Sequence, residues 1–140
     1  MTQRHASARW EGTLKEGKGH MKMPDAQYSG PFTFVSRFEE GEGTNPEELV
    51  GAAISGCFSM FLAALISKKD LSPDHVNTTA TVHLGADNGP KITQIDLDCE
   101  ASVSGLSDTD FQALVQEAKQ NCPISRLYAG TTIHVSAKLS

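Results

Sequence analysis

Three cysteines provide the most reactive side chains of this 140-residue chain, and Cys57 has the most ambiguous surroundings. It lies in the middle of GAAISGCFSMFLAALI, a stretch that is apolar almost all the way round. A thiol packed wholly among apolar side chains has a raised pKa and is inert, and composition alone favours that interpretation. The flanking Ser55, Gly56 and Ser59 are small, however, and leave room for another group to approach. Both a packed core residue and a thiol that a substrate reaches therefore stay open.

The other two cysteines have different contexts. Cys99 is in phase with apolar residues of KITQIDLDCEASVSG, which predicts a small core side chain on a strand. Cys122 follows the end of a predicted helix and precedes Pro123. If Pro123 opens a short helical turn, Cys122 lies at its N-terminus, where free N–H groups favour a thiolate. The alternative is a loop cysteine without a role.

A nucleophilic Cys57 needs a nearby cation, because a free cysteine with a pKa of ~8.5 is only a few per cent thiolate at pH 7. Arg37 is the candidate, expected on a strand just before the cysteine-bearing helix, and its guanidinium stays charged in any protein setting. A carboxylate, Glu47 or Glu48, would hold that guanidinium bidentately. The alternative for Arg37 is a solvated strand residue that pairs with Glu39.

The spacing of Glu47 and Cys57 bears on how a shared site is assembled. They are ten residues apart, which corresponds to about 15 Å along one straight helix. They cannot touch directly at that distance. If both serve one site, the simplest arrangement has a partner chain contribute one of them across a two-fold dimer.

Hydrophobic periodicity and capping signals predict the elements that position these residues. Asn45 is a natural N-cap, Pro46 suits the first helical position, and Glu48 completes a capping box. The third predicted strand carries Phe32, Phe34 and Phe38 on one face. The expected elements are strands at 6–15, 17–23 and 31–40, a helix from 45 to about 68, strands at 76–84 and 91–105, a helix at 108–121 and a strand at 131–139. This order, βββ-α-ββ-α-β, predicts one α+β domain over residues 1–140, with two helices packed on largely antiparallel sheet.

Composition excludes several classes of function. The net charge of −5 and the lack of a basic stripe argue against nucleic acid as a partner. The Cys57 helix is bracketed by Glu47-Glu48 and Lys68-Lys69, which predicts a poor membrane span. The N-terminal stretch has no apolar signal region, and an odd number of cysteines favours reduced thiols in the cytoplasm. The five histidines are scattered, with His83 and His134 on outward strand phases, so no metal site is expected.

The chain resembles the OsmC/Ohr family of osmotically inducible and organic hydroperoxide resistance proteins. The residues that carry the resemblance are GTNPEELVGAAISGCFSM and the later NCPIS, and RWEG and SRFEEGEG are similar to the OsmC branch. The resemblance covers essentially the whole chain. It implies an intertwined homodimer and a thiol-dependent peroxidase that needs no metal or other cofactor.

The resemblance also implies roles for single residues. Cys57 would attack the peroxide and become a sulfenic acid, and Cys122 would resolve it as an intramolecular disulfide that a thiol or dithiol reduces. Arg37 would be the activating arginine, with Arg9 as a fallback. Glu47 would orient it, since the family spacing to the cysteine favours Glu47 over Glu48. An apolar surround is expected to favour organic hydroperoxides over hydrogen peroxide; its members are Phe38, Phe58, Met60 and Phe61.

Two alternatives stay open. A general thiol–disulfide oxidoreductase would exchange disulfides without consuming peroxide, but the chain has no Cys-x-x-Cys motif. A non-enzymatic protein would bind an apolar ligand at a dimer groove, with an unreactive Cys57. The interpretation that the residues and the resemblance favour is a cytoplasmic peroxidase that acts on organic hydroperoxides.

Overall fold

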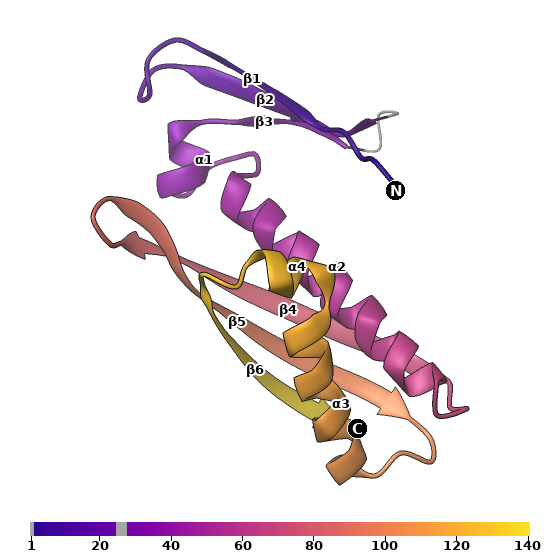
Figure 1. Ribbon diagram of the computed structural model, residues 1–140. Helices are drawn as coiled ribbons and strands as arrows, with labels where there is room; N and C mark the ends of the chain where they lie inside the picture. Colours follow the sequence, from indigo (N-terminus) through magenta and orange to yellow (C-terminus); the bar gives the residue numbers. More distant parts are fainter. Residues whose placement is uncertain (1, 25–27) are drawn as a thin grey trace. The chain divides into compact units, whose positions relative to one another are not determined.

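The computed structural model describes residues 2–24 and 28–140. The chain divides into two compact units, Met1–Leu49 and Val50–Ser140. The elements shown in Figure 1 are β1 (Ser7–Glu11), β2 (Lys18–Lys22), β3 (Ser29–Phe32), α1 (Phe34–Phe38), α2 (Pro46–Ser67), β4 (Pro73–Ala86), β5 (Pro90–Val103), α3 (Asp108–Asn121), α4 (Pro123–Leu127) and β6 (Thr132–Leu139). This is the predicted α+β class.

The first unit holds an antiparallel sheet in the order β1-β2-β3. Gly19 on β2 pairs with Trp10 on β1 and with Phe32 on β3. A Cβ at Gly19 would lie 2.5 Å from the Phe32 ring and 2.6 Å from the Trp10 ring, so glycine lets the two aromatic rings approach to 5.3 Å between centroids. The strand predicted at 6–15 is shorter, because Gly12 turns the chain at a φ of +95°.

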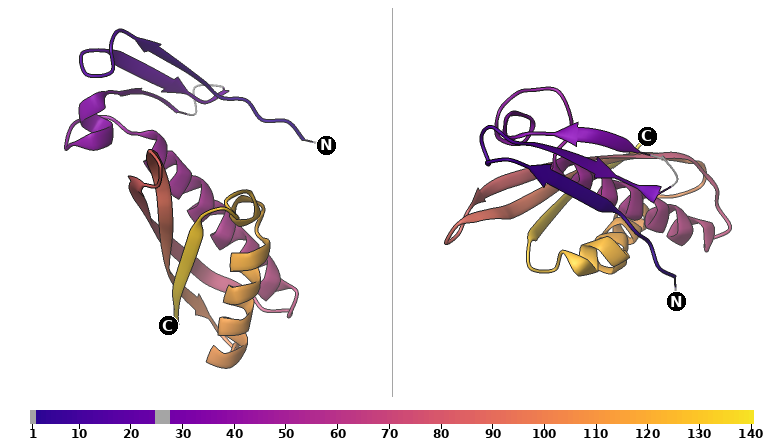
Figure 2. Two further views of the ribbon diagram at one scale, coloured as in Figure 1. Left: turned by 60° about the vertical axis from the view of Figure 1, so that its left-hand side comes forward. Right: turned by 90° about the horizontal axis from the view of Figure 1, so that it is seen from above.

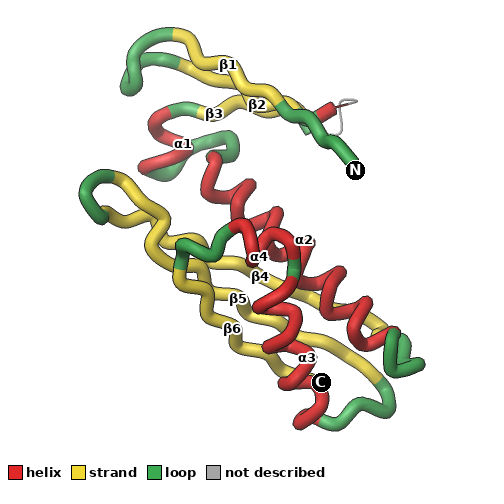
Figure 3. Tube along the Cα trace, viewed as in Figure 1, coloured by secondary structure: helices red, strands yellow, loops and turns green. Residues whose placement is uncertain are grey.

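The strand predicted at 31–40 is wrong beyond Phe32, as Figure 3 shows. Phe34–Phe38 forms the short helix α1, and Arg37 lies on that helix. The cause is a capping box: the Ser36 backbone N–H donates to Thr33 Oγ1, and the Thr33 backbone N–H donates to Ser36 Oγ. The phenylalanine spacing that suggested one strand face instead places Phe34 and Phe38 one helical turn apart, with ring centroids 5.0 Å from each other.

The second unit holds the sheet β4-β5-β6, with α2 and α3 on the same face of it (Figures 1 and 2). β4 and β5 are antiparallel, and β6 returns parallel to β5 after α3 and α4. The predicted phases of these strands and of α3 are confirmed, because the inward residues of β5 and α3 are buried and those of β4 and β6 are half-buried between exposed neighbours. The largest fully buried side chains are Ile54, Phe58, Leu62 and Ile66 from α2, Ile95, Leu97 and Cys99 from β5, Phe111 and Val115 from α3, and Cys122.

Helix α2 has one buried face and one exposed face, although it is apolar on both. Its buried side chains pack in the core, whereas the Met60 side chain is 79% exposed. By length and composition α2 is also long and apolar enough to cross a membrane. The charged residues at its ends therefore leave a longer apolar stretch between them than the sequence indicated. A helix that packs into the core of a soluble protein passes the same test.

Candidate functional site

Cys57 and Cys122 come together in the core of the second unit although 65 residues separate them. Cys57 lies midway along α2 and is half-buried, whereas Cys122 lies between α3 and α4 and is fully buried. The two side chains lie close enough for the Cys122 thiol to raise the pKa of Cys57, and both are free thiols. The packing of α2 against the start of α4 therefore creates a dithiol that no local motif contains.

Burial raises the pKa of the Cys57 thiol above its ordinary value. The backbone N–H of Ile124 on α4 acts against this, because it donates to the Cys57 sulfur and lowers the pKa. The Cys122 side chain raises the pKa of Cys57 further. Among the described residues, none of the groups that shift the pKa of Cys57 is a cation.

Two small residues, Gly56 and Ser59, lie close to Cys57 along α2. A Cβ added at Gly56 would meet nothing within 4 Å, so the α2 surface beside the cysteine is open. Ser59 is half-buried, and its Oγ donates to Thr78 Oγ1 at 2.7 Å. The sequence predicted open space beside Cys57, and the structure has such space next to Gly56.

Cys122 occupies the N-cap position of α4, as its place before Pro123 suggested. The Ser125 backbone N–H donates to the Cys122 sulfur at 3.4 Å, and the Ser125 Oγ lies 3.0 Å from the same sulfur. Cys99, by contrast, is wholly buried on β5, and burial raises its pKa. The structure thus brings two of the three cysteines together and leaves Cys99 as core packing.

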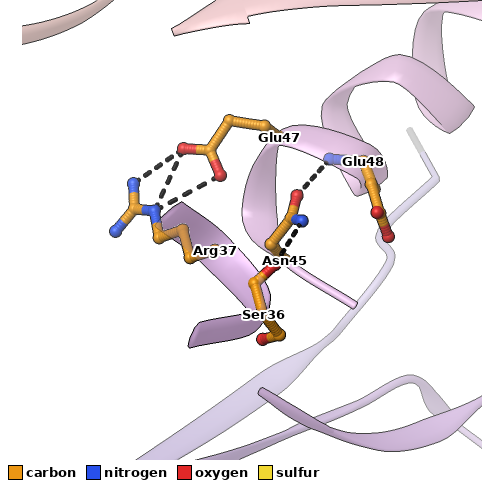
Figure 4. Close-up of polar contacts among 5 residues, drawn as sticks. All are labelled: Ser36, Arg37, Asn45, Glu47 and Glu48. Carbon is orange, nitrogen blue, oxygen red and sulfur yellow. Dashed lines mark hydrogen bonds and ion pairs between the residues drawn. The ribbon is translucent and has the colours of Figure 1, made fainter. Parts of the chain in front are cut away.

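Arg37 and Glu47 form an ion pair within the first unit (Figure 4). Arg37 Nη2 donates to Glu47 Oε1 at 2.8 Å, and Arg37 Nε donates to Oε1 at 3.1 Å and to Oε2 at 3.3 Å. The Glu47 side chain is 12% exposed and the Arg37 side chain 36%, so water screens the pair only in part. Two guanidinium nitrogens on one carboxylate fix the direction of the fork.

A network of buried and partly buried hydrogen bonds sets the relative position of Arg37 and Glu47. Asn45 Nδ2 donates to the backbone oxygen of Ser36 at 2.9 Å, and the Glu48 backbone N–H donates to Asn45 Oδ1 at 2.8 Å (Figure 4). Asn45 is therefore the predicted N-cap of α2, and it also ties that helix to α1. Ser36 Oγ completes the network by donating to the Thr44 backbone oxygen at 2.9 Å.

The structure shows which carboxylate contacts Arg37 and what the alternative residues, Glu48 and Arg9, contact instead. Glu48 does not close a capping box with Asn45, because its carboxylate instead accepts a hydrogen bond from Thr44 Oγ1 at 2.8 Å. Arg9 pairs with Glu11 on β1. The carboxylate that contacts Arg37 is that of Glu47.

An aromatic pocket of about 200 Å³ lies against Arg37 in the first unit. Phe38 is part of its wall, and the Arg37 guanidinium carbon lies 5.1 Å from the centroid of the Phe38 ring. The aromatic side chains that line the pocket are Trp10, Phe32, Phe34 and Phe38. Of the other residues expected around the site, Phe58 is core packing, Phe61 is half-buried and Met60 is exposed.

Sequence reasoning missed Ser36, Ser125 and the backbone N–H of Ile124. Ser125 follows Cys122 by three residues, which is the spacing at which an N-cap side chain accepts a hydrogen bond from the helix backbone. This spacing could have predicted the contact between Ser125 and Cys122. Ser36 follows Thr33 by the same interval. Across residues 2–24 and 28–140, no group of three histidine, cysteine or acidic side chains is placed to hold a metal ion.

The comparisons with known proteins agree with the resemblance found in the motifs. The family model described as OsmC-like protein matches residues 39–138. The chain is 41% identical over 122 residues to the peroxiredoxin OsmC of Escherichia coli (strain K12), which covers 86% of this chain and 85% of that protein. It is 32% identical over 91 residues to an organic hydroperoxide resistance protein of Xanthomonas axonopodis pv. citri, covering 64% of this chain and 63% of that one.

A solved structure shows the same fold. An OsmC-like protein of unknown function from Vibrio cholerae matches with a TM-score of 0.79 at 18% identity, covering 99% of this chain and 100% of the other. At that identity the likeness concerns the fold, and it confirms the predicted α+β architecture.

Proposed function

Because the chain belongs to the OsmC-like protein family, we propose that it is a thiol-dependent peroxidase that reduces organic hydroperoxides. The observation that carries the proposal is the contact between Cys57 and Cys122. One thiol is half-exposed and the other is buried behind it, which suits a nucleophile with a resolving partner. Relatives named peroxiredoxin and organic hydroperoxide resistance protein support the same chemistry.

In the proposed reaction the Cys57 thiolate attacks one oxygen of the hydroperoxide. The O–O bond breaks, the alcohol leaves after taking up a proton, and Cys57 becomes a sulfenic acid. The Cys122 thiolate then attacks the Cys57 sulfur, and hydroxide leaves as the disulfide forms. An external thiol or dithiol reduces the disulfide and returns both cysteines to the reduced state.

Arg37 is proposed to supply the cation that Cys57 needs, oriented by Glu47. A guanidinium stabilises negative charge both on the attacking sulfur and on the departing oxygen. The ion pair within the first unit supports this role, since Glu47 holds the guanidinium while leaving one nitrogen, Nη1, without a contact to that carboxylate. A fixed donor costs little reorganisation at the moment of reaction.

The pocket against Arg37 supports a preference for organic hydroperoxides. Its four aromatic side chains offer apolar surface to an alkyl or aryl tail at about 25 cal/mol per Å² buried. Hydrogen peroxide has no such tail. The tail would then rest on the aromatic rings while the peroxide group faces the guanidinium of Arg37.

The test is the loss of cumene hydroperoxide, tert-butyl hydroperoxide and hydrogen peroxide in the presence of a dithiol. We expect kcat/KM to be about tenfold or more higher for cumene hydroperoxide than for hydrogen peroxide, because burial of the aryl group contributes more than 1.4 kcal/mol. Bovine serum albumin serves as a control for non-specific thiol oxidation. A protein that consumes none of the three peroxides and whose Cys57 resists alkylation in the folded state would instead be a binding protein.

A homodimer with shared sites is proposed from the exposed face of α2. This face is apolar and follows helical spacing; its members are Ala52, Ala53, Gly56, Met60 and Ala64. Cys57 lies at the edge of it. A contiguous apolar surface of this kind is typically covered by a partner, and a second copy would bring its own Arg37–Glu47 pair to the dimer. The proposed place of action is the cytoplasm, where thiols stay reduced.

Met60→Lys is expected to convert the dimer into monomers, because it places a charge at the centre of the proposed interface. Sedimentation velocity of the wild type and the variant measures the change in mass. Leu127→Lys is the matched control, since Leu127 is 73% exposed on α4, outside the α2 face, and Met60 is 79% exposed. Equal masses for wild type and Met60→Lys would contradict this interface.

A further inference from the structure

Ser125 is a buried serine whose polar contacts point at one sulfur. It lies on α4 and is 5% exposed. Its backbone N–H donates to Cys122 Sγ at 3.4 Å, and its Oγ lies 3.0 Å from the same atom. A thiolate has no proton to donate, so when Cys122 is ionised the hydroxyl of Ser125 is the donor. Two donors from one residue are then directed at the Cys122 sulfur.

The two sulfurs differ in accessibility. Cys122 is 0% exposed, whereas Cys57 is half-buried beside the open surface at Gly56. Reduction of a disulfide starts with attack by a thiolate on one of its two sulfurs, and both access and the stability of the leaving thiolate decide which one. Access favours attack on Cys57. The contacts of Ser125 favour departure of Cys122.

We propose that Ser125 is a positioning residue that makes Cys122 the leaving group when the Cys57–Cys122 disulfide is reduced, so that the external thiol becomes attached to Cys57. This inference rests on the disulfide of the proposed function and adds the direction in which it opens. The same contacts hold the Cys122 thiolate toward Cys57 in the earlier step, when it attacks the sulfenic acid.

The exchange balances without a further reactant. The external thiolate attacks Cys57 Sγ, a new S–S bond forms, and the electron pair of the old bond leaves on Cys122 Sγ. The Ser125 O–H and N–H stabilise that negative charge. A second thiol group of the reductant then attacks its own sulfur in the mixed disulfide, which yields an oxidised dithiol and a Cys57 thiolate.

The direction of opening is tested by mapping the mixed disulfide. The wild-type protein is oxidised with diamide, a diazene that takes up the two thiol hydrogens, so the experiment does not depend on peroxidase activity. One equivalent of glutathione is then added, the reaction is quenched in acid, and free thiols are alkylated for peptide mass analysis. We expect glutathione on Cys57 and the alkyl group on Cys122. Glutathione on Cys122, or no intramolecular disulfide, would overturn the proposal.

The role of Ser125 is tested with Ser125→Ala and Ser125→Thr. The alanine variant is expected to open its disulfide about tenfold more slowly, because it loses one hydrogen bond to a charged group. Threonine keeps the hydroxyl and should restore the rate of disulfide opening.

The two variants separate a chemical role of Ser125 from a structural one. If Ser125 had a purely structural role, Ser125→Ala would lower the unfolding midpoint in urea and threonine would not restore the rate of disulfide opening. An alanine variant that opens its disulfide at the wild-type rate, or a threonine variant that does not recover the rate, contradicts the proposal. If the wild type consumes no peroxide but its diamide-formed disulfide opens at Cys57 as expected, the proposed function fails and this inference stands.

Discussion

Cys57→Ser is expected to lower kcat/KM for cumene hydroperoxide by at least about a thousandfold, because removal of a nucleophile abolishes the covalent step. A serine hydroxyl is far less ionised than a thiol at neutral pH. The substitution removes no large side chain, so the packing of α2 should survive it. The measurement is peroxide loss under a dithiol in excess, with circular dichroism as the check on folding.

Cys99→Ser is the matched control for Cys57→Ser. Cys99 is wholly buried on β5, opposite Thr78 of β4, and serine is nearly the same size as cysteine. We expect this variant to keep wild-type peroxide reduction. A Cys57→Ser variant with undiminished turnover, or a Cys99→Ser variant that folds but is inactive, would contradict the assignment of Cys57 as the nucleophile.

Arg37→Met is expected to lower kcat/KM for cumene hydroperoxide by about 10²–10³, the usual cost of removing a preorganised donor. Methionine keeps much of the apolar stem that lines the aromatic pocket, so the loss should reflect the charge. Arg37→Lys should recover only part of the rate, because an ammonium cannot reproduce the fork that contacts Glu47 through Nε and Nη2. Steady-state kinetics of both variants measure the difference.

Glu47→Gln completes a double-mutant cycle with Arg37→Met. If Glu47 acts by orienting Arg37, the double variant should be no slower than Arg37→Met alone, since the carboxylate then has nothing left to orient. Glu48→Gln is the control, because the Glu48 carboxylate contacts Thr44 rather than Arg37. Multiplicative losses in the double variant would show that Glu47 acts independently of Arg37.

The pH dependence of Cys57 alkylation measures the effect of Arg37 on the pKa of Cys57. Burial raises the pKa of Cys57, and the proposed cation lowers it. The thiol is protonated and unreactive below its pKa, so the loss of the cation should move the midpoint of alkylation to higher pH in Arg37→Met. An unchanged midpoint of alkylation in this variant would mean that Arg37 does not lower the pKa of Cys57.

Local patterns predicted the elements wherever the local and tertiary preferences agree. The alternation of apolar residues in β4, β5 and β6 matches the burial of their inward faces, and Asn45 caps α2 as its position before Pro46 indicated. The prediction was wrong where two patterns competed. The aromatic residues after Pro31 suggested a strand, whereas the reciprocal hydrogen bonds of Thr33 and Ser36 form a short helix. That helix places Arg37 beside Glu47.

By itself, the sequence determined the α+β class, the order of the main elements and the buried phase of Cys99, because these depend on periodicity and on caps that span a few residues. Only the tertiary structure decided that Cys57 meets Cys122, that Arg37 contacts Glu47 rather than Glu48 or Glu39, and that Ser125 faces the Cys122 sulfur. The physical reason is that these contacts depend on how helices pack and how chain segments turn. The contact between α2 and the start of α4 joins residues that are 65 positions apart. Such a contact produces no periodic pattern of residue types in the sequence.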